Sequence, residues 1–190
     1  MVVAGSAAVL LRTHIAGFLG LAEAEACAPE GEAFANFVAH PRPKAVQDAA
    51  FVDGEGRERR LSEFAGEGLV VNFWATWCAP CVREMPDLDR LAAALEGQPI
   101  RVLPVSLDRE GRPVVDEFYA VNGITRLPAA FDPGRRLMRA LAVGGLPTTV
   151  LIDAEGRERV RVEGIAEWSS PEHVAYVRRC LAPDGAADDA

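Results

Sequence analysis

The sequence predicts an α/β protein of three layers, in which helices cover both faces of a mixed β-sheet. Residues 70–74 are a run of strand-forming residues, and residues 100–107 are a continuous apolar run, which is typical of a strand buried on both faces. Residues 82–95 carry apolar side chains at helical spacing, and a second helix is expected at residues 112–122, before a glycine. A final hairpin over residues 148–164 reverses the strand direction and makes the sheet mixed.

Length and composition bound the class of protein. The chain has 190 residues, of which 49% are hydrophobic, so it can form one domain with a full core and extensions. Its 20 basic and 28 acidic residues give a net charge of −8, which leaves no basic surface for nucleic acid. We place the domain at residues 49–181 and expect residues 182–190 to be a disordered acidic tail.

Residues 1–26 are the most ambiguous part of the chain. Two apolar stretches, residues 1–11 and 15–22, are separated by Arg12, and small residues at alternate positions follow. This pattern indicates either an export signal with Arg12 in its basic part or a membrane anchor. In an anchor, Arg12 at mid-span costs about 2.5–3.5 kcal/mol. A truncated start and an ordinary helix packed on the domain are the other interpretations, and we favour the signal or anchor.

We interpret residues 27–48 as an extension and linker. Residues 32–39 have a short helical pattern, and two prolines then break any regular element. The domain begins with residues 51–57, in which a glycine turn joins two short strands, and continues with a helical turn at residues 61–64.

The most informative stretch is the junction where the strand at residues 70–74 meets the following helix. A Cys-x-x-Cys pair, Cys78 and Cys81, stands at this junction. Unpaired backbone N–H groups and the positive end of the helix dipole converge at a helix N-terminus. They lower a thiol pKa from about 8.5 to roughly 3.5–7.5, so Cys78 is expected to be a nucleophilic thiolate. Cys81 lies one helical turn further on, and the pair is predicted to form a reversible disulfide.

Two other uses of a Cys-x-x-Cys pair fit the sequence poorly. A zinc site needs four ligands, whereas the other cysteines, Cys27 and Cys180, stand alone and the histidines are scattered. A static structural disulfide is disfavoured because so small a ring at a helix start is easily reduced. We therefore adopt redox chemistry and predict no metal.

The second half of the domain continues the alternation of strands and helices. Pro86 removes one backbone hydrogen bond from the first helix, so a kink is expected there. A short strand is expected at residues 127–131 and a helix at residues 135–143, which two glycines terminate. Pro147 opens the final hairpin, and Pro171 begins the last helix, which is expected to reach about residue 181.

Three segments of the sequence resemble one protein family. They are VNFWATWCAPCVREMP at residues 71–86, GLPTTVLIDAEG at 145–156 and, more weakly, IAEWSSPE at 165–172. Over residues 49–181 the chain is similar to the thioredoxin superfamily, in the branch of exported TlpA-like and ResA-like thiol–disulfide oxidoreductases with a redoxin-type domain. This resemblance implies a thioredoxin-like α/β/α fold, with Cys78 as the attacking thiol and Cys81 as the resolving thiol.

The resemblance also assigns residues around the two cysteines. Pro147 matches a proline that is cis in this family, so that the backbone of Leu146 can pair with the extended chain of a client. From the residues alone, a trans proline that begins a strand is the better interpretation, and the resemblance reverses that order. Trp77, Ala79 and Pro80 flank the cysteines and are expected to contact the client, with Trp77 as an exposed platform.

Glu84 is the candidate for moving a proton. Ordinary thioredoxins have a buried aspartate where this chain has Asn72, which cannot titrate. Glu84 lies three residues after Cys81 and matches an active-site glutamate of ResA-like proteins. A partly buried carboxylate there has a raised pKa and can exchange protons with Cys81. On spacing alone, a solvent-facing helix glutamate is an equal alternative, and Trp74 and Trp168 are expected to be structural.

Cys27 and Cys180 are the remaining cysteines. In an oxidising compartment such a pair often forms a disulfide, which would tether the N-terminal segment to the last helix. They can equally be free thiols, because cysteine is also common as a small buried residue. We favour the disulfide if the protein is exported.

The function implied by the resemblance is reduction of disulfides in specific exported client proteins, of the kind needed for cytochrome c or respiratory oxidase maturation. The protein is then expected in the periplasm or on the outer face of the cytoplasmic membrane. Its electrons are expected from a membrane thiol transporter, and no cofactor is implied.

Two alternatives come from other functional classes. A thiol peroxidase of the redoxin group carries Pro-x-x-x-Thr-x-x-Cys, whereas Val71 and Ala75 stand at the proline and threonine positions here. A copper-binding chaperone uses two cysteines and a distal histidine, for which His173 is the candidate. Tight Cu(I) binding without disulfide reduction would favour the chaperone.

Overall fold

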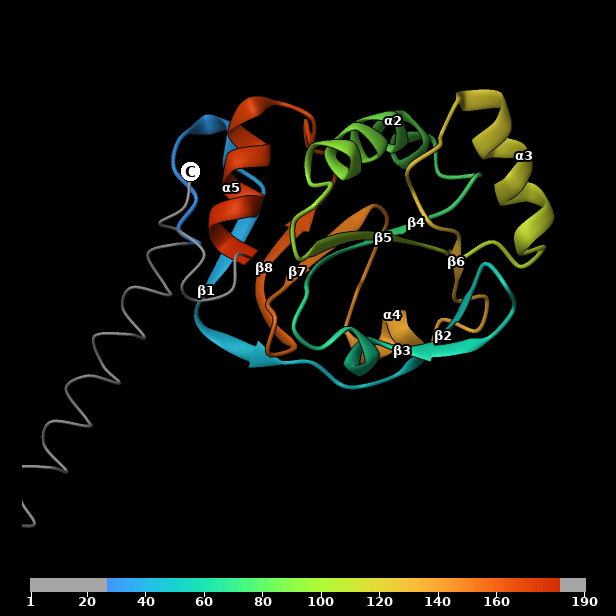
Figure 1. Ribbon diagram of the computed structural model, residues 1–190, viewed down its shortest axis with the longest axis horizontal. Coiled ribbons are helices and arrows are strands. Elements are labelled where there is room, and N and C mark those ends of the chain that lie inside the picture. The colour runs from blue at the N-terminus through green and yellow to red at the C-terminus, as the bar shows by residue number, and fades with distance from the viewer. Residues whose placement is uncertain (1–26, 182–190) are drawn as a thin grey trace, which may run out of the picture.

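The computed structural model describes residues 27–181, which form one mixed eight-stranded sheet with helices on both faces (Figure 1). The strands are β1 (Phe37–Ala45), β2 (Ala50–Asp53), β3 (Glu58–Arg60), β4 (Gly68–Trp74), β5 (Ile100–Ser106), β6 (Ala130–Phe131), β7 (Thr148–Ile152) and β8 (Arg157–Glu163). The helices are α2 (Ala79–Ala94), α3 (Arg112–Asn122), α4 (Arg136–Ala140) and α5 (Pro171–Leu181), with 3-10 turns η1 (Glu32–Phe34) and η2 (Leu61–Phe64). The strand order is β1-β8-β7-β4-β5-β6-β2-β3, which puts β4 inside the sheet.

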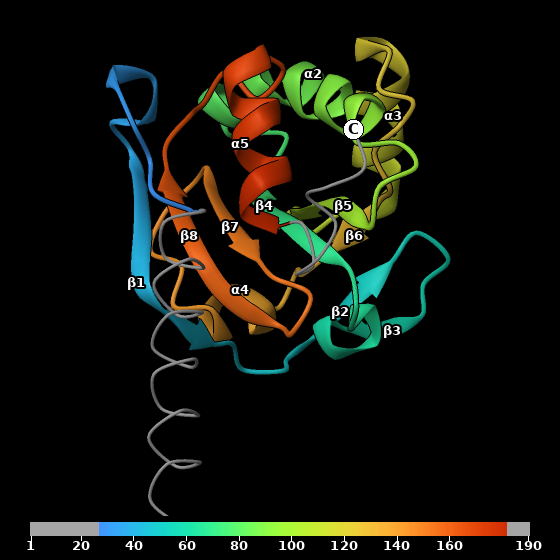
Figure 2. The same cartoon turned by 60° about the vertical axis from the view of Figure 1, so that its left-hand side comes forward.

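The sheet separates two layers of helices. Figures 1 and 2 show α2, α3 and α5 on one face, with α4 and η2 on the other. β4 pairs in parallel with β5 and antiparallel with β7, which confirms the predicted mixed sheet. Val70 and Trp74 of β4 pack in the core under α2, whereas Val71 and Phe73 pack in the core against α4. Because side chains alternate along a strand, β4 serves both layers and is buried throughout.

β1 is the largest departure from the predicted elements. Residues 32–39 do not form a helix: η1 takes only three residues, and Phe37–Ala45 is a strand antiparallel to β8. The prolines that suggested a linker lie where the pairing of β1 with β8 is irregular, between Ala39 and Lys44. Proline is tolerated there because an irregular edge strand needs fewer paired N–H groups.

Phe37 shows why this segment joins the sheet. Its side chain is buried, and its ring centroid lies 5.6 Å from that of Trp168 and 5.3 Å from that of Tyr176. In the ladder Phe37 is opposite Val162 of β8. These contacts join residues more than a hundred positions apart, so no local pattern could indicate them.

Two elements of the second half are shorter than predicted. β6 has only two residues of the strand expected at residues 127–131, and α4 has only five of the helix expected at residues 135–143. The carboxylate of Asp132 holds the first turn of α4, accepting hydrogen bonds from the backbone N–H groups of Arg136 at 2.7 Å and Met138 at 2.9 Å. The helix ends early because Ala142 has a left-handed φ of 50°.

Two predictions concern parts of the chain outside the described residues. The signal or anchor was expected at residues 1–26, and the acidic tail at residues 182–190. Between residues 27 and 181, no helix combines the length and the apolar character needed to cross a membrane.

Candidate active site

Cys78 and Cys81 form a disulfide at the start of α2. Cys78 is the residue directly before the helix, and its Sγ accepts a hydrogen bond from the backbone N–H of Cys81 at 3.4 Å. The Cα atoms of the two residues are 5.2 Å apart. Once the disulfide opens, the free N–H groups of this first turn are placed to stabilise a thiolate on Cys78.

The two sulfur-bearing residues differ in access. Cys78 is 7% exposed, whereas Cys81 is 0% exposed. Trp77 beside them is 62% exposed, Ala79 is exposed and Pro80 is half-buried in the first turn of the helix. A partner protein can therefore reach Cys78 more readily than Cys81, which confirms the predicted difference in exposure, and the order of attack stays a prediction.

Asp108 holds the turn that carries the cysteines, a role that the sequence reasoning missed. Its carboxylate accepts hydrogen bonds from the backbone N–H of Thr76 at 3.0 Å and from the Thr76 hydroxyl at 2.8 Å. The hydroxyl of Ser106, at the end of β5, donates to it at 2.8 Å. A signal existed: Asp108 follows a buried strand parallel to β4, and parallel strands end at the same edge of a sheet.

Pro147 approaches the cysteine turn from β7. The Leu146–Pro147 peptide bond is cis, as predicted, and Pro147 is buried while Leu146 is half-buried. Thr148 lies opposite Phe73 in the ladder of β7 with β4, so Pro147 stands at the end of β4 from which the cysteine turn leaves. The carbonyl of Pro147 accepts a hydrogen bond from the Gly164 N–H at 2.9 Å. Direct contact of Pro147 with the sulfurs stays a prediction.

Glu84 is buried, with 2% of its surface exposed, so the solvent-facing alternative is wrong. Its Oε1 accepts a hydrogen bond from Asn72 Nδ2 at 2.9 Å, and its Oε2 accepts one from Trp168 Nε1 at 3.2 Å. The backbone N–H of Ala166 also donates to it. The carboxyl group is thus held between α2, the central strand β4 and the segment that follows β8.

The surroundings of Glu84 change its acidity. Burial raises the pKa of Glu84 to about 7, because the charged form is poorly solvated inside the protein. Hydrogen bonds from Asn72, Trp168 and Ala166 lower the pKa, and the charge of Asp87 raises it. A carboxyl group that titrates near neutral pH can both take and give protons during a reaction.

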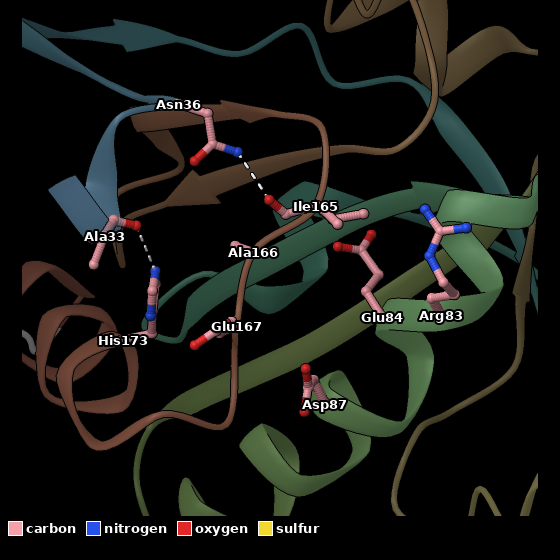
Figure 3. Close-up of a pocket in the computed structure, with 9 residues that line it drawn as sticks. All are labelled: Ala33, Asn36, Arg83, Glu84, Asp87, Ile165, Ala166, Glu167 and His173. Atoms are coloured by element: carbon pink, nitrogen blue, oxygen red, sulfur yellow. Dashed lines mark hydrogen bonds between the residues drawn. The ribbon is translucent and has the colours of Figure 1, made fainter.

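A cavity of about 380 Å³ lies beside Glu84 (Figure 3). Its lining comes from η1, α2, α5 and the segment after β8: Ala33, Asn36, Arg83, Glu84, Asp87, Ile165, Ala166, Glu167 and His173. Figure 3 shows the carboxyl group of Glu84 directed toward the segment that carries Ile165 and Ala166. Because Arg83 and Glu167 are exposed, the cavity opens to solvent beside a buried acid.

Trp168 and His173 have clear structural roles on this side of the sheet. Trp168 is buried, as expected, and it also holds Glu84 through its indole N–H. Both ring nitrogens of His173 have protein partners: Nδ1 pairs with Ser170 Oγ at 2.7 Å and Nε2 with the Ala33 carbonyl at 3.2 Å. The histidine considered for copper is therefore engaged in packing α5 against the N-terminal turn.

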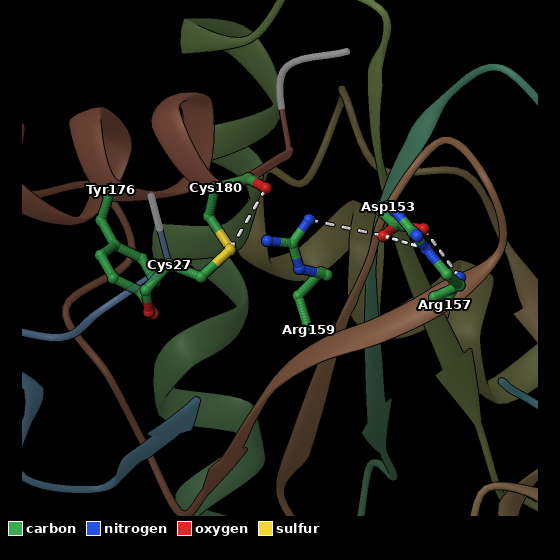
Figure 4. Close-up of a disulfide and its surroundings, with 6 residues drawn as sticks. All are labelled: Cys27, Asp153, Arg157, Arg159, Tyr176 and Cys180. Atoms are coloured by element: carbon green, nitrogen blue, oxygen red, sulfur yellow. Dashed lines mark hydrogen bonds and ion pairs between the residues drawn. A yellow bond between two sulfur atoms is a disulfide. The ribbon is translucent and has the colours of Figure 1, made fainter. Parts of the chain in front are cut away.

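Cys27 and Cys180 form a second disulfide (Figure 4). Their Cα atoms are 4.6 Å apart, within the range expected for a bridge, so the alternative of two free thiols is wrong. Cys27 is 1% exposed and Cys180 is 3% exposed. The Tyr176 hydroxyl donates to the Cys27 carbonyl at 2.6 Å, which adds a second link between the start of the described chain and α5.

Comparison with known proteins points to one group. Residues 31–160 match the AhpC/TSA family. Thiol-disulfide oxidoreductase ResA of Geobacillus thermodenitrificans (strain NG80-2) is 38% identical over 135 residues, which are 69% of this chain and 76% of that protein. ResA of Bacillus thuringiensis (strain Al Hakam) is 32% identical over 136 residues, or 72% of this chain and 76% of that protein.

A solved structure gives the same result for the fold. The thiol:disulfide interchange protein, a thioredoxin family protein from Chlorobium tepidum TLS, superposes with a TM-score of 0.56 at 26% identity. The match covers 72% of this chain and 97% of that one, which confirms the predicted thioredoxin-like fold. The chain belongs to the AhpC/TSA family and is a thioredoxin-like thiol–disulfide oxidoreductase.

Proposed function

We propose that this oxidoreductase reduces disulfides of specific client proteins outside the cytoplasm, with Cys78 as the attacking thiol. The observation that carries this proposal is the difference in access between Cys78 and the fully buried Cys81 at one helix N-terminus. The exposed ring of Trp77 and the backbone of Leu146 next to the cis proline offer a surface for an extended client segment.

The proposed reaction consists of two thiol–disulfide exchanges. In the first, the Cys78 thiolate attacks one client sulfur, the client S–S bond breaks, and a mixed disulfide and a client thiolate result. In the second, Cys81 loses its proton and attacks Cys78 Sγ, which releases the other client thiolate and forms the Cys78–Cys81 disulfide. Two electrons thus pass from the protein to the client, so the client is reduced and the protein is oxidised.

We assign Glu84 as the group that takes the proton of Cys81. It lies one turn after Cys81 on the same buried face of α2, and burial raises its pKa to about 7. The carboxylate can therefore accept the proton while the mixed disulfide is present and release it to the adjoining cavity afterwards.

The second disulfide supports the proposed location. Structural disulfides persist in oxidising compartments, and Cys27–Cys180 is a buried disulfide of this structural type. We therefore place the protein in the periplasm or on the outer face of the cytoplasmic membrane. There the Cys78–Cys81 pair needs an electron source, for which we propose a membrane thiol transporter. Apocytochromes and copper-site subunits are suitable clients, because only their reduced cysteines can receive haem or metal.

Trapping of the mixed disulfide tests this proposal. The full chain with Cys81→Ser is expressed in its own host, and disulfide-linked partners are identified by mass spectrometry after acid quenching. The matched control is the double variant Cys78→Ser/Cys81→Ser, which has no active-site thiol. We expect partners bound to Cys78 in the single variant, absent from the control and released by reductant.

Each outcome separates one part of the proposal. Absence of any partner above the level of the double variant would contradict attack by Cys78. Partners that are all cytoplasmic would contradict the location and leave the exchange chemistry in place. Partners without cysteines for haem or metal would contradict the proposed class of client.

A further inference from the structure

Asn72 lies at the centre of the sheet and connects Glu84 with the strand of the cis proline. Its side chain is fully buried, and Nδ2 donates both to Glu84 Oε1 and to Thr149 Oγ1, each at 2.9 Å. Thr149 belongs to β7 and follows Pro147 by two positions. Among residues 27–181, no group donates a hydrogen bond to the Asn72 Oδ1 atom.

The unpaired oxygen is informative because a buried carbonyl without a donor is costly. An amide group has two donors at one end and an acceptor at the other, and the two ends have nearly the same shape. A half-turn about the last side-chain bond therefore exchanges donor and acceptor without moving neighbouring atoms.

The observed orientation suits ionised Glu84. A carboxylate is only an acceptor, so the Nδ2 end of Asn72 faces it. A protonated carboxyl group carries an O–H, which needs an acceptor in the same place. The Oδ1 end of Asn72 is such an acceptor, and the hydroxyl of Thr149 can also donate to it after the half-turn.

We propose that the Asn72 amide turns when Glu84 gains a proton, which makes Asn72 a positioning residue that holds both states of the acid in one place. The proton passes from the adjoining cavity or from Cys81 to Glu84 Oε1, which then donates it in a hydrogen bond to Asn72 Oδ1. This inference deepens the proposed function, in which Glu84 must exist in both states during each turnover. An aspartate at position 72 would not be equivalent to the amide, because two carboxyl groups 2.9 Å apart cannot both be ionised.

Other charged groups around Glu84 have to be separated from this effect. Arg83 and Asp87 lie on the same helix, and Glu167 comes from the segment after β8. His173 faces the cavity from α5, and burial lowers its pKa below the ordinary histidine value. Glu84→Gln removes the proton from the network and leaves all four of these groups, so it is the matched control.

The test is the side-chain amide of Asn72 in NMR spectra of the oxidised full chain, recorded from about pH 5 to about pH 9. We expect strong contacts between the Asn72 Nδ2 protons and the Thr149 methyl group at high pH. These contacts should weaken at low pH, with the same midpoint as the ¹³C titration of the Glu84 carboxyl carbon. In Glu84→Gln the Asn72 contacts should not change with pH.

Three results would overturn the inference. The first is a constant amide orientation in the wild type while the Glu84 carboxyl carbon titrates. The second is a Glu84 carboxyl group that does not titrate across this range. The third is the same Asn72 transition in Glu84→Gln, which would assign it to His173 or another group. Since the experiment contains no client, its failure is distinct from failure of disulfide reduction.

Discussion

The two disulfides of this protein contain the same bond in different surroundings. Cys78–Cys81 joins residues three positions apart, at a helix N-terminus beside the exposed Trp77. Cys27–Cys180 joins residues 153 positions apart and is buried between the start of the described chain and α5. The comparison teaches that position, and not bond chemistry, separates a reactive pair from a structural one.

The same comparison separates chemistry from stability. A disulfide stabilises a fold mainly by restricting the unfolded chain, and this effect grows with the length of the closed loop. The long loop of Cys27–Cys180 gives that disulfide a large effect on stability, whereas the short loop of Cys78–Cys81 gives it little. In contrast, a sulfur of a partner protein reaches the Cys78–Cys81 disulfide more readily than the Cys27–Cys180 disulfide.

The largest expected effect is on activity. Cys78→Ser should abolish reduction of a protein disulfide, because serine supplies no sulfur for the mixed disulfide. The thermal midpoint of the reduced protein should stay close to that of reduced wild type, since the substitution is nearly isosteric. Reduction is measured as the release of client thiols, and residual activity above the uncatalysed rate would contradict the assignment.

The next effect is on stability. Replacement of Cys27 and Cys180 by alanine should lower the free energy of unfolding by roughly 2–5 kcal/mol, because the unfolded chain regains its freedom. The rate of client reduction should be unchanged below the unfolding transition. Denaturant unfolding of oxidised protein measures the difference, with Cys78→Ala/Cys81→Ala as the matched pair. A similar loss of unfolding free energy in both double variants would contradict the assignment of Cys27–Cys180 as the structural disulfide and Cys78–Cys81 as the reactive one.

A smaller effect on activity is expected for Glu84→Gln. Removal of the proton acceptor should slow turnover at least about tenfold, as is usual for positioned general bases. The fold should remain, because glutamine keeps the shape of the side chain. Rates of client reduction against pH measure the effect, and superimposable profiles for the two proteins would leave water as the proton carrier.

Glu84 should also make stability depend on pH. Its folded pKa is raised to about 7 from an ordinary 4.5, so the protonated group stabilises the fold below the unfolded pKa, and this contribution is lost as pH rises through about 7. Relative to Glu84→Gln, the free energy of unfolding of oxidised wild type should fall by on the order of 3 kcal/mol as the pH rises from below the unfolded pKa to above the folded pKa. Denaturant unfolding at several pH values measures it. Because both proteins contain His173, the contribution of its titration cancels in the difference between their free energies of unfolding. A difference that does not change with pH would contradict the raised pKa of Glu84.

The parts of the fold that could be predicted are those with local causes. The run of strand-forming residues in β4 and the helical spacing of α2 placed Cys78 correctly, because a buried strand and a helix start each leave a local pattern. The resemblance then supplied the cis bond before Pro147, which the residues alone left open.

The parts that could not be predicted depend on distant contacts. β1 joins the sheet where Phe37 packs against Trp168 and Tyr176, whereas its prolines suggested a linker. The hydrogen bonds that Thr76 donates to Asp108 and that Trp168 donates to Glu84 likewise join separate elements. The bonds themselves appear only once the chain is folded, although the position of Asp108 directly after a buried parallel strand was a signal for its edge of the sheet.

The most direct test of the central claim is graded reduction of the wild-type protein followed by alkylation of free thiols. Samples at increasing ratios of reductant to disulfide are quenched, and mass spectrometry assigns the alkylated cysteines. We predict that Cys78 and Cys81 are labelled first, while Cys27 and Cys180 are labelled only under conditions that unfold the chain. Labelling of all four cysteines together, or of Cys27 and Cys180 first, would contradict the account.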